Sequence, residues 1–301
     1  MRLRLCRASI TGAGLVGVYT GLISCADGIT KLISASFAAP QLYGIAGLVV
    51  AGLCVLCDRH GSRRAGLRTH CPGAMALRSG ATVLALLGFF HALRLLPLTD
   101  VFVFVGLMPI LAGLMSGPIL GEPVRPAAWA ALLAACLGVV CLFPQGLGAM
   151  TAGHLWALLA AVLGTFSMVM ARFIGKRENN ALAQVFYPNL AVGLVMGLAL
   201  PFVWAPMGWI DLGWILAYAI LLFSARWLLV VALRLLPAYV VTPLMNLQFG
   251  WMVLIGAVAF GEFPGAGTYL GVAIVVGSGL FLVWDQTAPR AKRLGPLEKY
   301  S

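Results

Sequence analysis

Charged residues are scarce in this chain of 301 residues: Asp, Glu, Lys and Arg together make up 10% of it, and nine residues are acidic. Soluble domains carry about 25% charged residues. The chain therefore lacks the polar surface that a water-soluble fold of this size needs. Hydrophobic residues make up 61% of the sequence and the mean hydropathy is +0.99. We expect an integral membrane protein, with the lipid bilayer as its solvent.

Several kinds of functional site are also missing from the sequence. There is no G-x-x-x-x-G-K-[ST] loop, which excludes ATP-driven transport by this chain itself. Cys54 and Cys57 have metal or redox spacing, but there is no second pair and no histidine cluster with ligand spacing, so we interpret the thiols as small buried hydrophobes. We expect no metal, no cofactor and no enzyme activity. The net charge of +11 comes from short basic clusters between apolar runs, and this distribution argues against nucleic acid as a partner.

One stretch of the sequence occurs twice. Residues 92–143 and 232–283 both begin with ALRLLP and both contain a Gly-Glu pair, at an offset of 140 residues without a gap. Unrelated apolar segments rarely share a basic residue, a proline and an acidic turn in register, so this is an internal duplication. Each copy contains two apolar runs of about 20 residues, the length that crosses a bilayer as a helix.

Proline, glycine and charged residues divide the chain into ten apolar runs. The expected spans are residues 10–29, 38–57, 73–92, 100–120, 127–143, 153–174, 182–204, 212–235, 239–260 and 268–284. They predict an all-α membrane protein with one five-helix half in 1–148, a second in 149–288 and a basic tail in 289–301. The first run resembles a signal peptide, but its removal would leave nine spans and unmatched halves, so we expect it to be retained.

The distribution of Lys and Arg predicts an orientation. With the N-terminus in the cytoplasm, all but three of the 20 Lys and Arg residues fall on the cytoplasmic side, the exceptions being Lys31, Arg94 and Arg226. Both termini are then cytoplasmic. Corresponding segments of the two halves lie five spans apart, an odd number, so the halves have opposite orientations. Such repeats allow a central site to face either side of the membrane in turn, which predicts a carrier of a small-molecule substrate.

Arg226 is the sharpest candidate site residue. It lies near the middle of the eighth span, with too many apolar residues on both sides for easy snorkelling. Charge within a membrane is costly and is treated as functional by default. Its guanidinium could face a water-filled cavity and clamp a carboxylate or phosphate. The alternative is a structural arginine bonded to helix carbonyls and polar neighbours.

Other candidate substrate-binding residues are polar or aromatic side chains within the spans. Asn246 and Gln248 lie near the middle of the ninth span, and since they are two residues apart they do not share a helix face. Either could bind a substrate, or they could join neighbouring helices. Trp227, Trp251 and Tyr187 could form the wall of a cavity for a flat or amphipathic solute, and core packing is their alternative role.

Three residues at the expected external ends are candidates for gating. Asp27 and Lys31 are four apart, close enough on a helix to pair, so they form either an exposed ion pair or a gate. His91 lies among apolar residues, where it either packs with a hydrogen bond or carries a proton. No Asp or Glu lies at the centre of an expected span, so the residues do not support proton coupling, and facilitated diffusion or exchange is at least as plausible.

The two repeats resemble a known family. ALRLLPLTDVFVF…LGEPVRPAAWAALLAACLGVVCLF and ALRLLPAYVVTP…FGEFPGAGTYLGVAIVVGSGLFLVW are similar to the two EamA-type repeats of the drug/metabolite transporter superfamily, and the likeness runs from Asp27 to Trp284. Two positions depart from the family pattern. Many relatives carry an arginine in the second span, where this chain has Gln41. Many of the closer relatives carry an acidic residue after the proline of the ninth span, where this chain has Leu244 and Met245 after Pro243.

The resemblance implies a ten-helix carrier, a monomer or homodimer, in a bacterial inner membrane, working by alternating access. Members move amino acids, other small metabolites, drugs, riboflavin or S-adenosylmethionine in either direction. By this analogy we favour export of a small organic metabolite, and Arg226 suggests that it bears an anionic group. Uptake of riboflavin, S-adenosylmethionine or a similar metabolite is the alternative. A membrane scaffold that transports nothing is another, and it predicts a packed midplane without a cavity.

Overall fold

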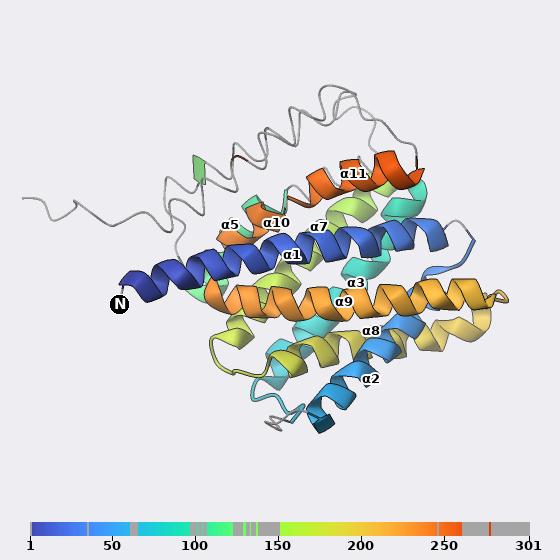
Figure 1. Cartoon of the computed structure of the whole chain (residues 1–301), viewed down its shortest axis with the longest axis horizontal. Helices are drawn as coiled ribbons and strands as arrows, with labels where there is room; N and C mark the ends of the chain where they lie inside the picture. Colours follow the sequence, from blue (N-terminus) through green and yellow to red (C-terminus); the bar gives the residue numbers. More distant parts are fainter. Residues whose placement is uncertain are drawn as a thin grey trace, which may run out of the picture.

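The computed structural model describes residues 2–34, 36–60, 66–96, 101, 104, 107–122, 129–130, 133, 137, 151–245, 247–260 and 277. Over these residues every regular element is a helix, and the helices form one bundle (Figure 1). The fifth and tenth expected spans (127–143 and 268–284) lie outside the described residues except at isolated positions.

Six of the described helices are long and apolar enough to cross a membrane. They are α1 (Arg2–Ser34), α2 (Ile45–His60) with the π-helix η1 (Pro40–Gly44) at its start, α3 (Pro72–Leu95), α7 (Ala152–Gly175), α8 (Ala181–Val203) and α9 (Trp209–Leu235). Each lies close to an expected span, and α1 is longer than expected at both ends. These helices confirm a multi-pass, all-α membrane protein.

The ninth expected span differs from the prediction. In place of one helix over residues 239–260, the chain forms α10 (Ala238–Met245) and α11 (Gln248–Phe260), with Leu247 in a turn between them. Pro243 lies within α10, so the break between the two helices comes after the proline. In the fourth expected span the structure describes α5 (Met108–Leu120).

The described helices repeat as the sequence does. α5 and α11 both have 13 residues and begin 140 residues apart, and α3 and α9 end at the equivalent leucines Leu95 and Leu235. The packing is reciprocal, because α1 packs along α9 while its counterpart α7 packs along α3 (Figure 1). In the same way α5 packs on α7, and α11 packs on α1. The two halves therefore share one packing scheme and are joined through their first and third helices.

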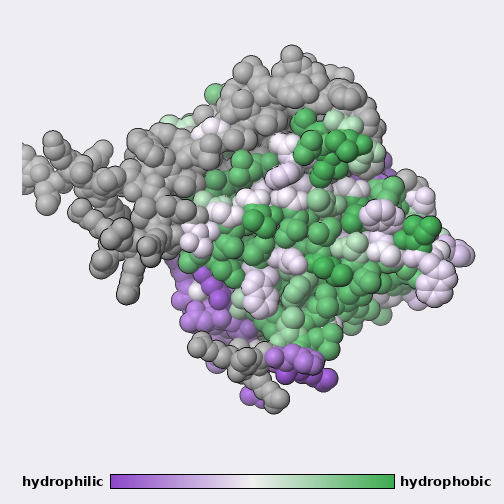
Figure 2. Space-filling view, viewed as in Figure 1, coloured by the Kyte–Doolittle hydropathy of each residue, from purple (hydrophilic) through white to green (hydrophobic). Residues whose placement is uncertain are grey.

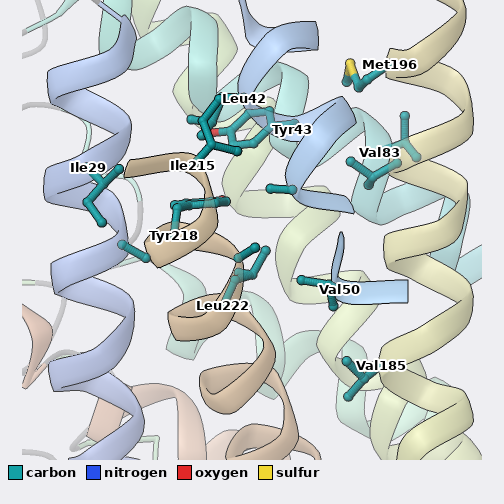
Figure 3. Close-up of a cluster of buried hydrophobic side chains, with 14 of the residues drawn as sticks. Ile29, Leu42, Tyr43, Val50, Val83, Val185, Met196, Ile215, Tyr218 and Leu222 are labelled. Atoms are coloured by element: carbon teal, nitrogen blue, oxygen red, sulfur yellow. The ribbon is translucent and has the colours of Figure 1, made fainter. Parts of the chain in front are cut away.

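One buried apolar cluster of the described residues joins η1 and the helices α1, α2, α3, α8 and α9. In Figure 3, Leu42 and Tyr43 of η1 and Ile215 and Tyr218 of α9 point toward one another, with Ile29 of α1 beside them. Val50 of α2 and Val185 of α8 extend the same cluster toward α8, along with Val83 of α3 and Met196 of α8.

Helices α2 and α8 approach each other through glycines. A Cβ on Gly47 of α2 would lie 2.8 Å from the Asn189 carbonyl oxygen, and one on Gly193 of α8 would lie 2.9 Å from the Leu48 backbone nitrogen. Both of these atoms belong to the backbone, and the Cβ on Gly193 would also lie 2.9 Å from side-chain atoms of Leu48. In lipid, small residues of this kind allow helices to pack closely.

The outer surface of the bundle is apolar. Leu198, Phe202 and Ile210 are 77%, 86% and 78% exposed. Figure 2 shows hydrophobic residues across the middle of one face, with hydrophilic residues gathered toward its lower left. Exposed large side chains in such numbers mark a surface that meets lipid, not water.

Polar contacts gather the loops at two ends of the bundle. The loop between α7 and α8 contacts the loop between α2 and α3, since Glu178 accepts a hydrogen bond from Thr69 and Asn180 donates to carbonyls of the same loop. At another point Gln41 Nε2 of η1 donates to the carbonyl of Ala205, between α8 and α9, at 2.8 Å. Each pairing joins segments that the Lys and Arg distribution places on the same side of the membrane.

Candidate functional site

A cavity of about 210 Å³ lies among the helices of the bundle. Its described lining comes from α1, η1 and α3 of the first half with α5, and from α7, α9, α10 and α11 of the second. The polar and aromatic residues of the lining are Tyr19, Asp27, Tyr43, Arg78, Thr82, Phe89, Ser167, Tyr218, Arg226 and Gln248. The interface between the repeats is where sequence reasoning expects the site.

Each lining helix contributes one face. On α9 the lining residues include Tyr218, Leu222 and Arg226, and on α1 they include Tyr19 and Asp27. Spacings of four and eight residues place side chains on one side of a helix. The cavity is therefore a consequence of how these helices are rotated about their axes.

Arg226 has no charge partner within the described part of the chain. Its side chain is half-buried in the cavity wall, and its Nε is buried without a hydrogen-bond partner there. A structural arginine would be bonded to helix carbonyls or to a carboxylate. Neither kind of bond joins Arg226 to a described residue.

Asp27 is buried and lines the same cavity. It is 8% exposed, and its Oδ2 accepts a hydrogen bond of 2.6 Å from Gln248 Nε2, which joins α1 to α11. The expected exposed ion pair with Lys31 is therefore wrong for Asp27. The cause is the length of the helix: α1 continues to Ser34, about two turns beyond Asp27, so Asp27 does not lie at the helix end. It still lies away from the centre of the helix.

Arg78 is a site residue that sequence reasoning missed, because the Lys and Arg distribution assigns it to the cytoplasmic side. It lies in the second turn of α3, is 5% exposed and lines the cavity. Its Nη1 donates to Gln184 Oε1 of α8 at 2.7 Å, while its Nε is buried without a partner among the described residues. The sequence did contain one indication: Thr82 lies four residues after Arg78, so the two form a polar stripe on one face of an otherwise apolar helix.

Three tyrosines give the cavity an aromatic side. Tyr43 and Tyr218 lie with ring centroids 6.1 Å apart, and Tyr43 meets Phe90 edge-on at 5.8 Å. Tyr19 adds a third ring from α1. Tyr43 is presented by the π-helix η1, a rare geometry that is frequent at functional sites. Aromatic walls of this kind suit a flat solute, which can stack on them or meet their edges.

The other predicted binding residues are not among the described lining. Trp227 packs beside Phe223 with centroids 6.0 Å apart, Tyr187 packs edge-on to Phe186 at 5.2 Å, and Trp251 is 44% exposed. Asn246 lies outside the described residues.

The remaining gating candidates also lie away from the described lining. His91 has its ring 5.0 Å from that of Trp156, and Lys31 is half-buried near the end of α1. No group of three His, Cys, Asp or Glu side chains that could hold a metal occurs in the described ranges, where Cys54 is buried and Cys57 exposed.

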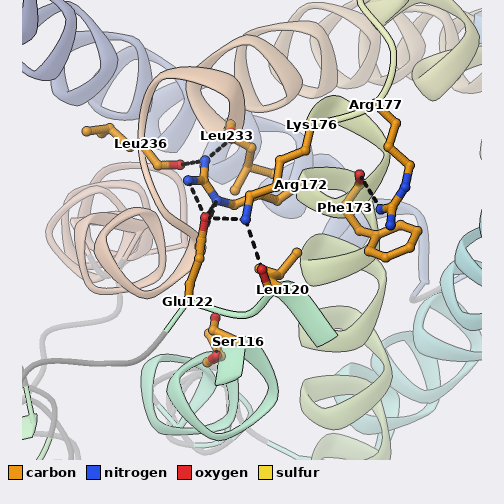
Figure 4. Close-up of polar contacts among 10 residues, drawn as sticks. Ser116, Leu120, Glu122, Arg172, Phe173, Lys176, Arg177, Leu233 and Leu236 are labelled. Atoms are coloured by element: carbon orange, nitrogen blue, oxygen red, sulfur yellow. Dashed lines mark hydrogen bonds and ion pairs between the residues drawn. The ribbon is translucent and has the colours of Figure 1, made fainter. Parts of the chain in front are cut away.

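A charged cluster is centred on Arg172 of α7 (Figure 4). Its Nε and Nη2 donate to Glu122, after α5, at 2.9 and 2.7 Å. Its Nη1 donates to the carbonyls of Leu233 and Leu236 at the end of α9, at 2.7 and 2.6 Å. Lys176 lies 2.8 Å from the same carboxylate. Since Leu233 also lines the cavity, this Arg172 cluster ties three helix ends together at its margin.

The Arg172 cluster lowers the pKa of Glu122. Burial alone raises this pKa, but hydrogen bonds from Arg172 and Lys176, together with their charges, bring it below the ordinary value of 4.5. A carboxylate with a lowered folded-state pKa contributes stability above its unfolded pKa and loses it as the pH falls through the folded value. We expect Glu122→Gln to lower the melting temperature at pH 7, and the gap from wild type to close below pH 4.5. A gap that is the same at every pH would contradict this assignment.

Comparison with known proteins points to transport. The chain is 28% identical over 224 residues to a riboflavin transporter of Rhizobium johnstonii, covering 74% of each chain. It is 25% identical over 232 residues to a riboflavin transporter of Vibrio cholerae serotype O1, covering 76% of this chain and 78% of that one. No family model matches.

A solved structure shares the fold. One chain, described only as "Crystal structure of protein", superposes with a TM-score of 0.72 over 92% of this chain and 96% of that chain, at 18% identity. The likeness extends along nearly the whole of both chains, so the helical arrangement is one that occurs in an experimental structure.

Proposed function

We propose that this chain is a secondary transporter that carries a flat, polar organic solute through the cavity between its halves, with riboflavin as the first candidate. The observation that carries the proposal is the cavity itself, which combines tyrosine rings with the Asp27–Gln248 pair and with Arg226, a cation that pairs with no described carboxylate. The two relatives named riboflavin transporters support the same class of solute.

The lining offers complementary contacts to such a solute. The rings of Tyr19, Tyr43 and Tyr218 can stack on a planar ring system or meet its edge. Gln248 uses one amide hydrogen on Asp27 and keeps a second hydrogen and its carbonyl oxygen. A donor and an acceptor side by side match the N–H and C=O of a ring imide. Aromatic stacking with a few placed polar groups is the usual composition of a small-molecule site.

The architecture that we propose is the EamA-type one: ten helices in two inverted halves, both termini in the cytoplasm of a bacterium, and alternating access to the cavity. The recurrence of helix limits and the reciprocal packing of α1 on α9 and α7 on α3 support it. The relatives' names fit riboflavin uptake at least as well as the export that family analogy favours, so we propose uptake. A scaffold that transports nothing predicts a packed midplane and an Arg226 that is fully bonded to protein. The cavity argues against the packed midplane, and the unpartnered Nε of Arg226 argues against full bonding.

The test is riboflavin uptake by proteoliposomes containing the full chain, with a variant that fills the cavity. Gly164 lines it, and a Cβ there would meet only Met108 at 3.6 Å and Ala85 at 4.0 Å, both of which also line the cavity. Gly164→Leu should therefore fold and slow uptake at least tenfold. Gly14→Leu is the matched control, because Gly14 is exposed and has no neighbour within 4 Å. Equal uptake by wild type and Gly164→Leu, or no uptake by wild type, would reject the proposal.

A further inference from the structure

Two arginines from different halves share the cavity without an acidic partner among the described residues. Arg78 comes from α3 and Arg226 from α9, and both line the cavity. No ion pair joins either of them to a carboxylate of the described chain. The carboxylate in the described lining, that of Asp27, is engaged by Gln248 on α11.

This arrangement leaves the described lining with more positive than negative charge. A guanidinium stays protonated in proteins and has five N–H donors in a fixed fork. Arg78 uses Nη1 on Gln184, and the Nε atoms of Arg78 and Arg226 are both buried without a partner in the described chain. Buried cations are normally paired, because an uncompensated charge away from water is costly. Arg78 is buried and Arg226 is half-buried, and together they favour an anion from outside the chain as the partner.

We propose that Arg78 and Arg226 form an anion subsite that takes the phosphate monoester of a flat-ring solute, while the ring lies among the tyrosines. This rests on the proposed function and names the substrate class of the same cavity. A phosphate monoester carries about −1.5 to −2 at pH 7 and three acceptor oxygens. Its charge balances two guanidinium groups and its oxygens can accept donors from two helices. A carboxylate, with one charge, would leave one arginine uncompensated.

The test compares two flavins that differ in this group. Binding of riboflavin and of flavin mononucleotide to the purified full chain is followed by quenching of flavin fluorescence. Wild type should bind the phosphorylated flavin at least tenfold more tightly. Arg78→Gln and Arg226→Gln should each lower its affinity about tenfold, and the double variant should lose the preference between the two flavins. Arg177→Gln is the control, because Arg177 is exposed and stacks on Phe173.

The outcomes distinguish a failure of the proposed subsite from a failure of the proposed transport function. If wild type binds riboflavin as tightly as its phosphate, the subsite is overturned while the proposed function stands. If neither flavin binds, the proposed riboflavin function fails, and inorganic phosphate then decides the subsite. Phosphate should raise the melting temperature of wild type but not of Arg78→Gln, and it should do so more than acetate at equal ionic strength. The absence of this protection, or equal protection by acetate, rejects a phosphate subsite.

Discussion

Gly193→Leu should leave no monodisperse, folded protein after extraction in detergent. A Cβ on Gly193 would lie 2.9 Å from the backbone nitrogen of Leu48, and the reverse contact from Gly47 is as short. The Leu48 side chain, also 2.9 Å from this Cβ, can turn aside, but the backbone nitrogen cannot. Relief therefore requires α2 to separate from α8, which disrupts the apolar cluster around Tyr43 (Figure 3). Overpacking costs about 1 to 3 kcal/mol where side chains can adjust. We expect a larger loss of stability for Gly193→Leu, since the backbone of α2 cannot adjust in this way.

The control lies one turn away on the same helix. A Cβ on Gly197 would have no neighbour within 4 Å, so Gly197→Leu changes helix propensity and size without changing packing. Size-exclusion profiles and melting temperatures of the two variants measure the difference. If Gly193→Leu elutes and melts as wild type does, the α2–α8 contact is not the close approach described above.

Arg172→Gln should produce the second largest loss of stability. Arg172 is 13% exposed and Glu122 17%, and the arginine also donates to two backbone carbonyls at the end of α9 (Figure 4). Removing one partner of a buried, hydrogen-bonded ion pair costs about 3 to 5 kcal/mol. Some solvent access places the expected value near the lower limit. Arg172→Lys should recover part of it, since one ammonium cannot serve both the carboxylate and the carbonyls.

Lys176→Gln is the matched control for this prediction. Lys176 contacts the same carboxylate at 2.8 Å, but it is 39% exposed. Exposed pairs contribute about 0 to 1 kcal/mol, so its melting temperature should stay close to that of wild type. Similar losses for Arg172→Gln and Lys176→Gln would show that the helix ends are held by something other than the arginine.

Much of the fold could be predicted from the sequence because bilayer thickness dictates element length. Six helices lie close to expected spans, since a run of about 20 apolar residues has few alternatives in lipid. The ninth span is expected as one helix and is two, because hydropathy measures how apolar a run is and does not show where a helix breaks.

The candidate site could be predicted only in part, for a geometric reason. Arg226 and Gln248 stand out in the sequence as polar residues within spans, and both line the cavity. Trp227 is expected there too, but it follows Arg226 and so lies about 100° around the helix from it. Tyr218, eight residues before Arg226, shares its face, and nothing in the hydropathy pattern marks it.

The sequence by itself determined that the protein lies in a lipid bilayer, that one stretch is duplicated, and where most spans lie. Composition and the length of apolar runs show this because both are set by the bilayer. Only the tertiary structure decided which residues meet at the centre. It brought Asp27 into the bundle by extending α1 and turned Arg78 of α3 into the same cavity as Arg226 of α9. The depth and rotation of a helix depend on the helices packed against it, and no single span contains that information.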